Sequence, residues 1–321
     1  MIRTAECVSP MHPDKMCDRI SDTLLDLHLQ QDPNSRCAIE TCGGIGWVFI
    51  TGEVTSNAVV TRENIEKVVH DVTTDDTIQV MININSQSPE IANGVDTGGA
   101  GDQGIMIGYA CRDNEEFLPQ EYYLSRELNK FVFDKYPYDG KTQVTMNGNS
   151  LRVVCSFQNA PTEMLEGLVG GFFSRYPQYH IEALHCNPAG DWNIGGFTAD
   201  AGLTGRKLAV DNYGPRVPIG GGAFSGKDAT KVDRSAAYMG RRIAVDILEE
   251  RPEVQEVMVQ LAYAIGYDQP LQATAIVDGE HEFIKGYDLS PKGIIDFLEL
   301  RNPIFGRTAG FGHMGAGFNW K

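Results

Sequence analysis

The fold class is decided by a strand–turn–strand stretch at residues 143–157, QVTMNGNSLRVVCSF. Asn147-Gly148 lies between two β-rich runs, and this dipeptide is a preferred centre of a two-residue type I′ hairpin turn. Helical runs flank the hairpin, from Pro119 to about Tyr136 before it and from Pro161 to Arg175 after it, and a strand over His180–Cys186 follows. Hairpins that alternate with helices predict an α+β chain rather than a helical bundle or a β-sandwich.

A similar succession precedes this stretch and a third follows it. The predicted elements before it are a helix from Pro13 to near Gln31, a hairpin of Arg36–Cys42 and Gly46–Val54 turning at Gly43-Gly44, a helix over Thr61–Val72 and a strand over Ile78–Ile84. Those after it are a long helix that places Val232, Ala236, Met239, Ile243 and Ile247 on one side, a strand over Val257–Ile265 and a short helix over Pro291–Glu299. We therefore expect three domains of similar size and mixed content, at residues 1–97, 98–193 and 194–321.

An irregular stretch, QSPEIANGVDTGGAGDQG at residues 87–104, separates the first unit from the second. A structureless loop of this length inside a compact domain is usually a lid or a binding loop. We therefore expect this segment to lie at a functional site.

Composition narrows the classes of function. The 321 residues include 27 Lys plus Arg against 43 Asp plus Glu, a formal charge of −16, which opposes binding to nucleic acid and to anionic membranes. No stretch reaches roughly 18 apolar residues, and the first residues lack the pattern of a signal peptide. Seven cysteines without C-x-x-C spacing indicate reduced thiols. We expect a cytoplasmic protein with neither nucleic acid nor membrane as a partner.

A glycine-rich loop precedes the long helix of the third unit. Gly221-x4-Gly226-Lys227 has the spacing of a phosphate-binding P-loop, but Asp228 stands where that motif requires Ser or Thr. The loop is therefore a poor Walker A motif. Glycines that expose backbone N–H groups, a lysine and a helix start just downstream still favour binding of an anion.

Cations are concentrated around this loop. Eight of them fall within 37 residues: Arg206, Lys207, Arg216, Lys227, Lys231, Arg234, Arg241 and Arg242. The spacing of Lys227, Lys231 and Arg234 beside the glycine loop favours polyphosphate binding. For Arg241 and Arg242 we expect a solvated helix face with ion pairs.

Two aspartates stand near predicted helix starts. Asp14 and Asp233 could each merely complement a helix dipole. Next to a polyphosphate site they would be natural magnesium ligands, because Mg²⁺ takes one or two carboxylates plus phosphate oxygens.

Several longer motifs resemble the S-adenosylmethionine synthetase (methionine adenosyltransferase) family. They occur in family order and extend to about Gly315: HPDK at residues 12–15, TGE at 51–53, QSP at 87–89, GAGDQG at 99–104, GLTGRK at 202–207 and GGGAFSGKD at 220–228. The resemblance implies three similar α/β-sandwich-like domains with pseudo-threefold symmetry. It also implies a homodimer with shared active sites, often paired into a homotetramer. The implied substrates are ATP and L-methionine, and the implied cofactors are Mg²⁺, two ions per site, and K⁺.

The resemblance also assigns residue roles. Carried over position by position, the catalytic residues would be His12, Lys141, Arg206 and Lys227. Contacts to ATP would come from His12, Asp139, Lys141, Asp191, Trp192, Asp200, Arg206, Lys207, Ala223 and Lys227. Methionine would be held by Glu53, Gln87, Asp102, Asp200 and Lys231. Asp14 and Asp233 would bind magnesium, and Glu40 would bind potassium.

The chemistry of the residues agrees with this assignment. A thioether is already a neutral nucleophile, so attack of the methionine sulfur on C5′ of ATP needs no deprotonating base. The reaction needs cations that stabilise the negative charge of the leaving tripolyphosphate, and His12 can donate a hydrogen bond to the departing oxygen. Two alternatives stay open: a non-catalytic nucleotide-binding regulatory relative and a kinase-like phosphotransferase that uses the glycine loop.

Overall fold

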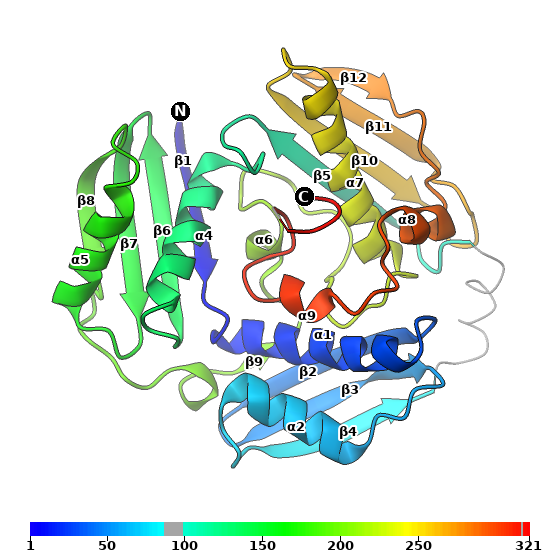
Figure 1. Ribbon diagram of the computed structural model, residues 1–321, viewed down its shortest axis with the longest axis horizontal. Helices are drawn as coiled ribbons and strands as arrows, with labels where there is room; N and C mark the ends of the chain where they lie inside the picture. The colour runs from blue at the N-terminus through cyan, green and yellow to red at the C-terminus, as the bar shows by residue number, and fades with distance from the viewer. Residues whose placement is uncertain (87–98, 316) are drawn as a thin grey trace.

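The computed structural model describes residues 1–86, 99–315 and 317–321. Three four-stranded sheets, each with helices on one face, surround a common centre that contains α6 (Leu208–Asp211), α9 (Phe305–Thr308) and the C-terminus (Figure 1). No helix within the described residues is both long and apolar enough to cross a membrane.

The first sheet has the strand order β4-β3-β2-β9. Its strands are β2 (Arg36–Gly44), β3 (Trp47–Thr55), β4 (Gln79–Asn85) and the two-residue β9 (Gly202–Leu203). Helices α1 (Pro13–Gln31) and α2 (Arg62–Thr73) accompany this sheet. β2 and β3 form an antiparallel hairpin, whereas β4 lies parallel to β3 after the α2 crossover.

The second sheet repeats this plan in the order β8-β7-β6-β1. It contains β1 (Ile2–Val8), β6 (Gly140–Asn147), β7 (Ser150–Phe157) and β8 (His180–Cys186). Its helices are α4 (Gln120–Phe133) and α5 (Thr162–Phe173). The β6–β7 pair is again an antiparallel hairpin, and β8 is again parallel to its neighbour.

The third sheet has the order β12-β11-β10-β5 and differs at one edge. It contains β5 (Gly104–Cys111), β10 (Glu256–Tyr263), β11 (Gln272–Val277) and β12 (Glu280–Phe283). β12 follows β11 directly as a hairpin, so no helix crosses between them. The associated helices are α7 (Val232–Glu250) and α8 (Pro291–Phe297).

Each sheet takes its fourth strand from another part of the chain. β1 precedes the first sheet but pairs with β6 of the second, β5 precedes the second hairpin but pairs with β10, and β9 returns from the third segment to pair with β2. This cyclic exchange interlocks the three sheets. β1, β9, β11 and β12 were not among the strands expected from sequence, because they are short or carry no distinctive alternation.

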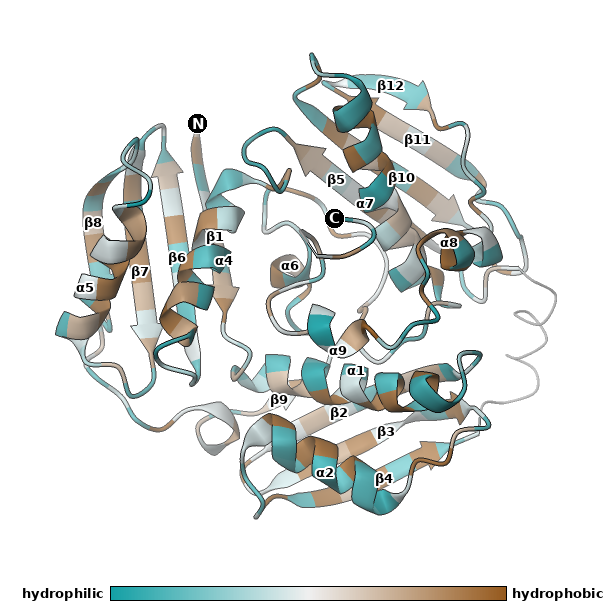
Figure 2. Cartoon of the chain, viewed as in Figure 1, coloured by the Kyte–Doolittle hydropathy of each residue, from teal (hydrophilic) through white to brown (hydrophobic). Residues whose placement is uncertain are grey.

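Packing follows the apolar periodicity of the helices. Met16, Ile20 and Leu24 are buried along α1, as the spacing of three and four residues predicts. Figure 2 shows polar and apolar bands alternating along α1 and α2, whereas β10 and β11 are mainly apolar. α7 approaches β5 closely, since a Cβ on Gly108 would lie 1.9 Å from the carbonyl carbon of Gly240. Only glycine fits at that contact.

The two predicted hairpins are confirmed, with their turns displaced. Asn147 pairs with Ser150, so Gly148-Asn149 forms the turn, and the φ of Gly148 is +58°. In the first hairpin Gly44 pairs with Trp47, and Ile45-Gly46 forms the turn in place of Gly43-Gly44. In both hairpins a glycine in the left-handed region fixes the turn.

Candidate active site

His12 ends the loop before α1 and caps that helix. Its Nδ1 accepts a hydrogen bond from the Asp14 N–H at 3.2 Å, and Pro13 occupies the first helical position. Burial lowers the pKa of His12 to about 4, and Lys207 and Lys141 act in the same direction. At neutral pH the ring is therefore neutral with its proton on Nε2, because Nδ1 serves as an acceptor. His12 is thus a hydrogen-bond donor without charge.

Asp14 lies at the centre of a cluster of cations. Lys207 Nζ lies 2.5 Å from its Oδ2, Arg206 Nε lies 3.5 Å from its Oδ1, and the Leu203 N–H donates to Oδ1 at 3.0 Å. Burial alone raises the pKa of Asp14, but the hydrogen bonds from Lys207 and Leu203 outweigh it and leave that pKa lowered. We call Asp14 and Lys207 the first pair; Arg206 is a second cation beside it.

Pairing of β9 with β2 brings this cluster together. It lays the GLTGRK segment at residues 202–207 across the first turn of α1. A Cβ on Gly202 would lie 2.3 Å from the carbonyl carbon of Pro13, so a side chain there would push the segment away. The glycine therefore allows Arg206 and Lys207 to reach Asp14.

Lys227 and Asp233 form the second pair. Lys227 Nζ lies 2.7 Å from Asp233 Oδ2, and the Gly222 N–H donates to Asp233 Oδ1 at 2.9 Å. Lys231, at the start of α7, pairs instead with Asp228, whose carboxylate also accepts the Cys37 N–H. Asp228, which breaks the Walker A pattern, thus ties the loop to β2.

The glycine loop adjoins the open edge of β2. Lys227 and Ala38 form an isolated antiparallel bridge, and the Ile39 N–H donates to the Gly226 carbonyl at 3.0 Å. Glu40 follows on the same strand. Burial raises the pKa of Glu40 while Lys227 opposes that shift, which places the carboxylate under the influence of the lysine.

The two glycine-rich segments touch each other. A Cβ on Gly205 would lie 2.5 Å from the Cβ of Ala223, and the φ of Gly205 is +80°. The segment that carries Arg206 and Lys207 therefore packs directly on the segment that carries Lys227. Neighbouring loops of a single chain thus present the lysines of both pairs, whose aspartates lie in the first turns of α1 and α7.

A third group lies at the start of β6. Asp139 Oδ2 accepts the Gly196 N–H at 3.1 Å, and burial raises the pKa of Asp139. Lys141 is exposed. Its charge lowers the pKa of His12, whereas the charge of Asp200 raises it. The structure therefore brings Asp139, Lys141 and Asp200 to the surroundings of His12.

Asp191 and Trp192 lie in the segment that follows β8. Asp191 Oδ1 accepts from the N–H and hydroxyl of Thr162, at the first turn of α5, and from Asn187 Nδ2. Trp192 Nε1 donates to Asn187 Oδ1 at 3.3 Å. The Asp191 carboxylate is thus engaged in holding α5 and Asn187, and Asn187 in turn holds the indole.

The residues expected to bind methionine are less closely grouped. Glu53 on β3 pairs in register with Ala38, the residue bridged to Lys227. Asp102 is exposed and accepts the N–H of Gln103. Gln87 lies outside the described residues, as do residues 88–98 of the expected lid.

Two expectations for the cation-rich region are wrong. Arg234 is fully buried, where it pairs with Asp22 and donates to the Lys227 carbonyl, so it cannot meet a phosphate. Arg241 is also fully buried and donates to the carbonyls of Tyr109, Phe117 and Glu116. Helical spacing alone did not separate the partly exposed Lys227 and Lys231 from Arg234 and Arg241, which face the core. Arg242 does pair with Asp246 on the same helix, as expected.

The sequence reasoning also missed three carboxylates on α1. Asp18, Asp22 and Asp26 follow Asp14 at intervals of four residues and therefore lie on one side of the helix. Asp18 and Asp22 are fully buried. Acids repeated on the core-facing side of an amphipathic helix are a signal that could have identified them.

Known proteins of one family match this chain throughout. Family models for the N-terminal, central and C-terminal domains of S-adenosylmethionine synthetase match residues 1–89, 97–162 and 194–321. The S-adenosylmethionine synthase of Parvibaculum lavamentivorans is 38% identical over 99% of this chain and 95% of its own length. That of Clostridium tetani is 39% identical over 97% of this chain and 93% of its own.

A solved structure agrees in fold. An unusual S-adenosylmethionine synthetase from Campylobacter jejuni superposes with a TM-score of 0.89 at 32% identity, covering 99% of this chain and 96% of that one. The expected three-domain α+β fold and the family resemblance are thereby confirmed. The chain belongs to the S-adenosylmethionine synthetase family.

Proposed function

We propose that this chain is a catalytically competent methionine adenosyltransferase. It transfers the adenosyl group of ATP to the sulfur of L-methionine and releases phosphate and diphosphate through a tripolyphosphate intermediate. The observation that carries the proposal is the arrangement of two lysine–aspartate pairs whose lysines lie on glycine segments in contact, beside a histidine whose Nδ1 accepts the Asp14 N–H. A regulatory relative without activity would have no need for this complete set.

The transfer step requires stabilisation of charge rather than a base. A sulfur lone pair forms the S–C5′ bond as the C5′–O bond breaks, and the electron pair of that bond passes to the tripolyphosphate oxygen. Lys141, Arg206, Lys207 and Lys227 offer preorganised positive charge to that leaving group. His12 donates its Nε2 proton as a hydrogen bond to the departing oxygen. The same cations hold tripolyphosphate while water cleaves it.

The donors available for magnesium are Asp14 and Asp233. Carboxylate oxygens are the ligands that Mg²⁺ prefers, and Asp233 is partly exposed beside the glycine loop. Within the described residues, no three His, Cys, Asp or Glu side chains converge on one point. We therefore propose two Mg²⁺ ions per site that complete their coordination with phosphate oxygens. When bound, they neutralise charge on the polyphosphate. We assign K⁺ to Glu40.

The remaining substrate contacts are assigned by their surroundings. We assign Asp139, Asp200 and Ala223 to ATP, since Asp200 lies near His12 and Ala223 lies in the glycine segment, and we assign Trp192 to stacking on adenine. Asp191 contributes by holding Asn187, which orients the indole of Trp192. For methionine we propose Glu53, Gln87, Asp102, Asp200 and Lys231.

We further propose a homodimer with shared active sites, either alone or paired into a homotetramer. The sheet face of β2, β3 and β4 that carries no helix exposes Trp47, Phe49 and Met81. Because side chains alternate along a strand, Glu40 and Glu53 lie on this same face, further along the strands. An apolar face continuous with expected ligand residues fits a second copy of the chain that covers the site.

The location in the cell is part of the same proposal. All seven cysteines are free, and six of them are buried. Free thiols are typical of a reducing compartment, so we place the reaction in the cytoplasm.

Product identification tests this function directly. The chain is incubated with ATP, methionine, Mg²⁺ and K⁺, and the products are identified by mass spectrometry. S-adenosylmethionine with phosphate and diphosphate is the expected outcome. ADP with a phosphorylated acceptor would instead indicate a kinase-like phosphotransferase, and nucleotide binding without turnover would indicate the regulatory relative.

A further inference from the structure

Two buried carboxylates on α1 contact the backbone of both glycine segments. Asp18 and Asp22 lie one helical turn apart, and both side chains are fully buried. Each accepts the N–H of a glycine, and each has a buried cation as counterion. Neither belongs to the residues assigned to ATP, methionine or metal.

Asp22 holds the segment that carries Lys227. Its Oδ1 accepts the Gly226 N–H at 2.8 Å, and the Arg234 guanidinium binds both of its oxygens, at 2.6 and 2.8 Å. Arg234 Nη1 also donates to the Lys227 carbonyl at 2.9 Å. The buried Asp22–Arg234 ion pair thus holds both the Gly226 N–H and the Lys227 carbonyl.

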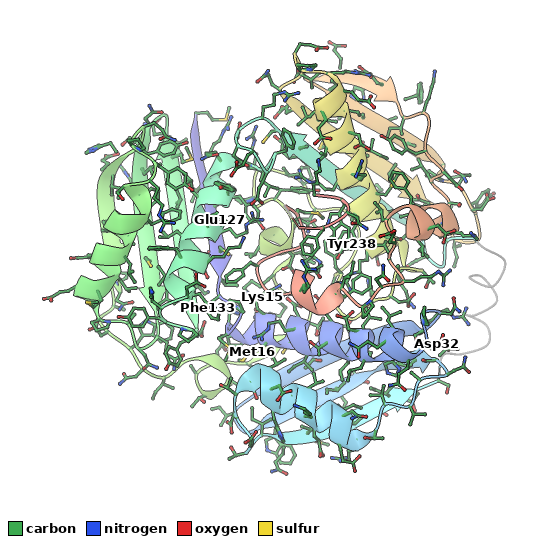
Figure 3. The ribbon with its side chains drawn as sticks, viewed as in Figure 1. Lys15, Met16, Asp32, Glu127, Phe133 and Tyr238 are labelled. Carbon is green, nitrogen blue, oxygen red and sulfur yellow. The ribbon has the colours of Figure 1, made fainter. Side chains whose placement is uncertain are left out.

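Asp18 holds the other segment in the same way. Its Oδ1 accepts the Gly205 N–H at 2.8 Å, directly before Arg206 and Lys207. Lys15 Nζ lies 3.0 Å from Asp18 Oδ2 and 2.5 Å from Asp211 Oδ1. Figure 3 labels Lys15 and Tyr238, and both lie toward the centre of the molecule. Tyr238 belongs to the Asp22 side, because its hydroxyl accepts a hydrogen bond from Arg234 Nε.

The two glycines that Asp18 and Asp22 hold also share a backbone conformation. Gly205 and Gly226 have φ of +80° and +83°, in the left-handed region that favours glycine. In each segment the glycine stands immediately before a cation of the site. A carboxylate bound to the glycine N–H therefore fixes the direction in which the next residue leaves the backbone.

We propose that Asp18 and Asp22 are positioning residues for catalysis: through the Gly205 and Gly226 N–H groups, they set the spacing and orientation of Arg206, Lys207 and Lys227. This inference rests on the proposed function, because it concerns the same phosphate-facing cations. Buried ion pairs contribute little net stability after desolvation, so their presence at both segments calls for another role. A rigid turn of α1 supplies a fixed distance between the two anchors.

The first test compares Asp22→Asn with Asp26→Asn. Asp26 lies one turn further along α1 and also accepts backbone N–H groups, but from Phe305 and Gly306, away from the glycine segments. Asp22→Asn removes the charge that holds Arg234 against the Lys227 carbonyl. It should therefore lower kcat and weaken binding of Mg²⁺–tripolyphosphate, each by about tenfold or more, since small misplacements of catalytic groups carry effects of this order. Asp26→Asn should leave both within about twofold in folded protein.

A second variant separates positioning from folding. Asp22→Leu combined with Arg234→Met replaces the ion pair by apolar groups, a change that often preserves stability, but frees the Gly226 N–H. We expect a folded protein with the same loss of kcat and of tripolyphosphate affinity. A folded double variant with wild-type kcat and affinity would overturn the proposal.

Calorimetry with tripolyphosphate and Mg²⁺ keeps the two proposals apart. It needs no turnover, so it reports on positioning even if the wild-type chain forms no S-adenosylmethionine. Loss of affinity in Asp18→Asn and Asp22→Asn with an inactive wild type would support positioning and contradict the proposed function. Unchanged affinity in both variants, with an active wild type, would contradict only positioning.

Discussion

The two lysine–aspartate pairs use the same residue types in different surroundings. In the first pair, the Asp14 side chain is 2% exposed and has two cations, Lys207 and Arg206. In the second pair, Asp233 is 16% exposed and has one, Lys227. The first pair is therefore held by burial and by an excess of positive charge, whereas the second is partly exposed and close to the carboxylate of Glu40.

This difference indicates that the two pairs have different roles in binding polyphosphate and metal. Excess positive charge around Asp14 suits the polyphosphate, and the neutral ring of His12 adds a donor there without adding charge. Asp233 faces a single lysine, and this arrangement suits an exchange of partners. The partly exposed Lys227 can leave the Asp233 carboxylate to bind a phosphate oxygen, and the carboxylate can then bind a metal ion. Substitutions in the two pairs should therefore differ in size and kind.

The largest effect is expected in the first pair. Asp14→Asn should lower kcat by about 10²-fold or more, by analogy with loss of a preorganised polar group. Asparagine keeps the size of the side chain and can still accept the Leu203 N–H, so the fold should survive. Steady-state kinetics at saturating ATP, methionine and Mg²⁺ measure the effect, with Glu66→Gln on the surface of α2 as control. Near-normal turnover in a folded Asp14→Asn protein would remove this residue from the metal site.

A similar but smaller effect is expected in the second pair. Lys227→Ala should lower kcat by around 10²-fold, because one cation of the site is lost. Asp233 is left without its lysine, so Mg²⁺ affinity should not fall, in contrast to Asp14→Asn. Kinetics over a range of Mg²⁺ concentrations distinguish the two variants, with Lys67→Ala at an exposed ion pair as control. A loss of Mg²⁺ affinity with unchanged kcat would reverse the assignment of roles.

Acid should destabilise the fold through His12, which lies next to the first pair. The ring is neutral in the fold down to a pKa of about 4, but in the unfolded chain it protonates near its usual pKa of 6.5. The unfolded state therefore binds more protons as pH falls below 6.5, and the fold loses stability, on the order of 2 kcal/mol by pH 4.5. His12→Asn, which can still cap α1, should show a smaller fall in Tm between pH 6.5 and 4.5 than the wild type. Equal falls in both proteins would place the His12 pKa near its ordinary value.

Much of this arrangement was readable from the sequence, and the remainder depended on contacts distant along the chain. Apolar periodicity and the Asn147-Gly148 dipeptide predicted the helices and hairpins, because these depend on neighbouring residues. The exchange of β1, β5 and β9 could not be predicted, because strand partners are chosen by the packing of the whole molecule. For the same reason the sequence does not show that Arg234 is buried against Asp22: helical spacing gives the side of α7 on which a residue lies, but not what covers that side.

The smallest effect concerns the adenine base, which we place against neither pair. Trp192→Ala should raise the KM for ATP by about tenfold, because stacking of a base on an aromatic ring contributes about 1–3 kcal/mol. The KM for methionine should change less, and kcat should stay close to wild type, because the cations of both pairs remain in place. KM values for the two substrates, measured in the same assay, provide an internal control. If the KM for methionine rises more than that for ATP, Trp192 does not stack on adenine. The indole would then belong with the methionine-binding residues, and the two pairs would keep their assigned roles.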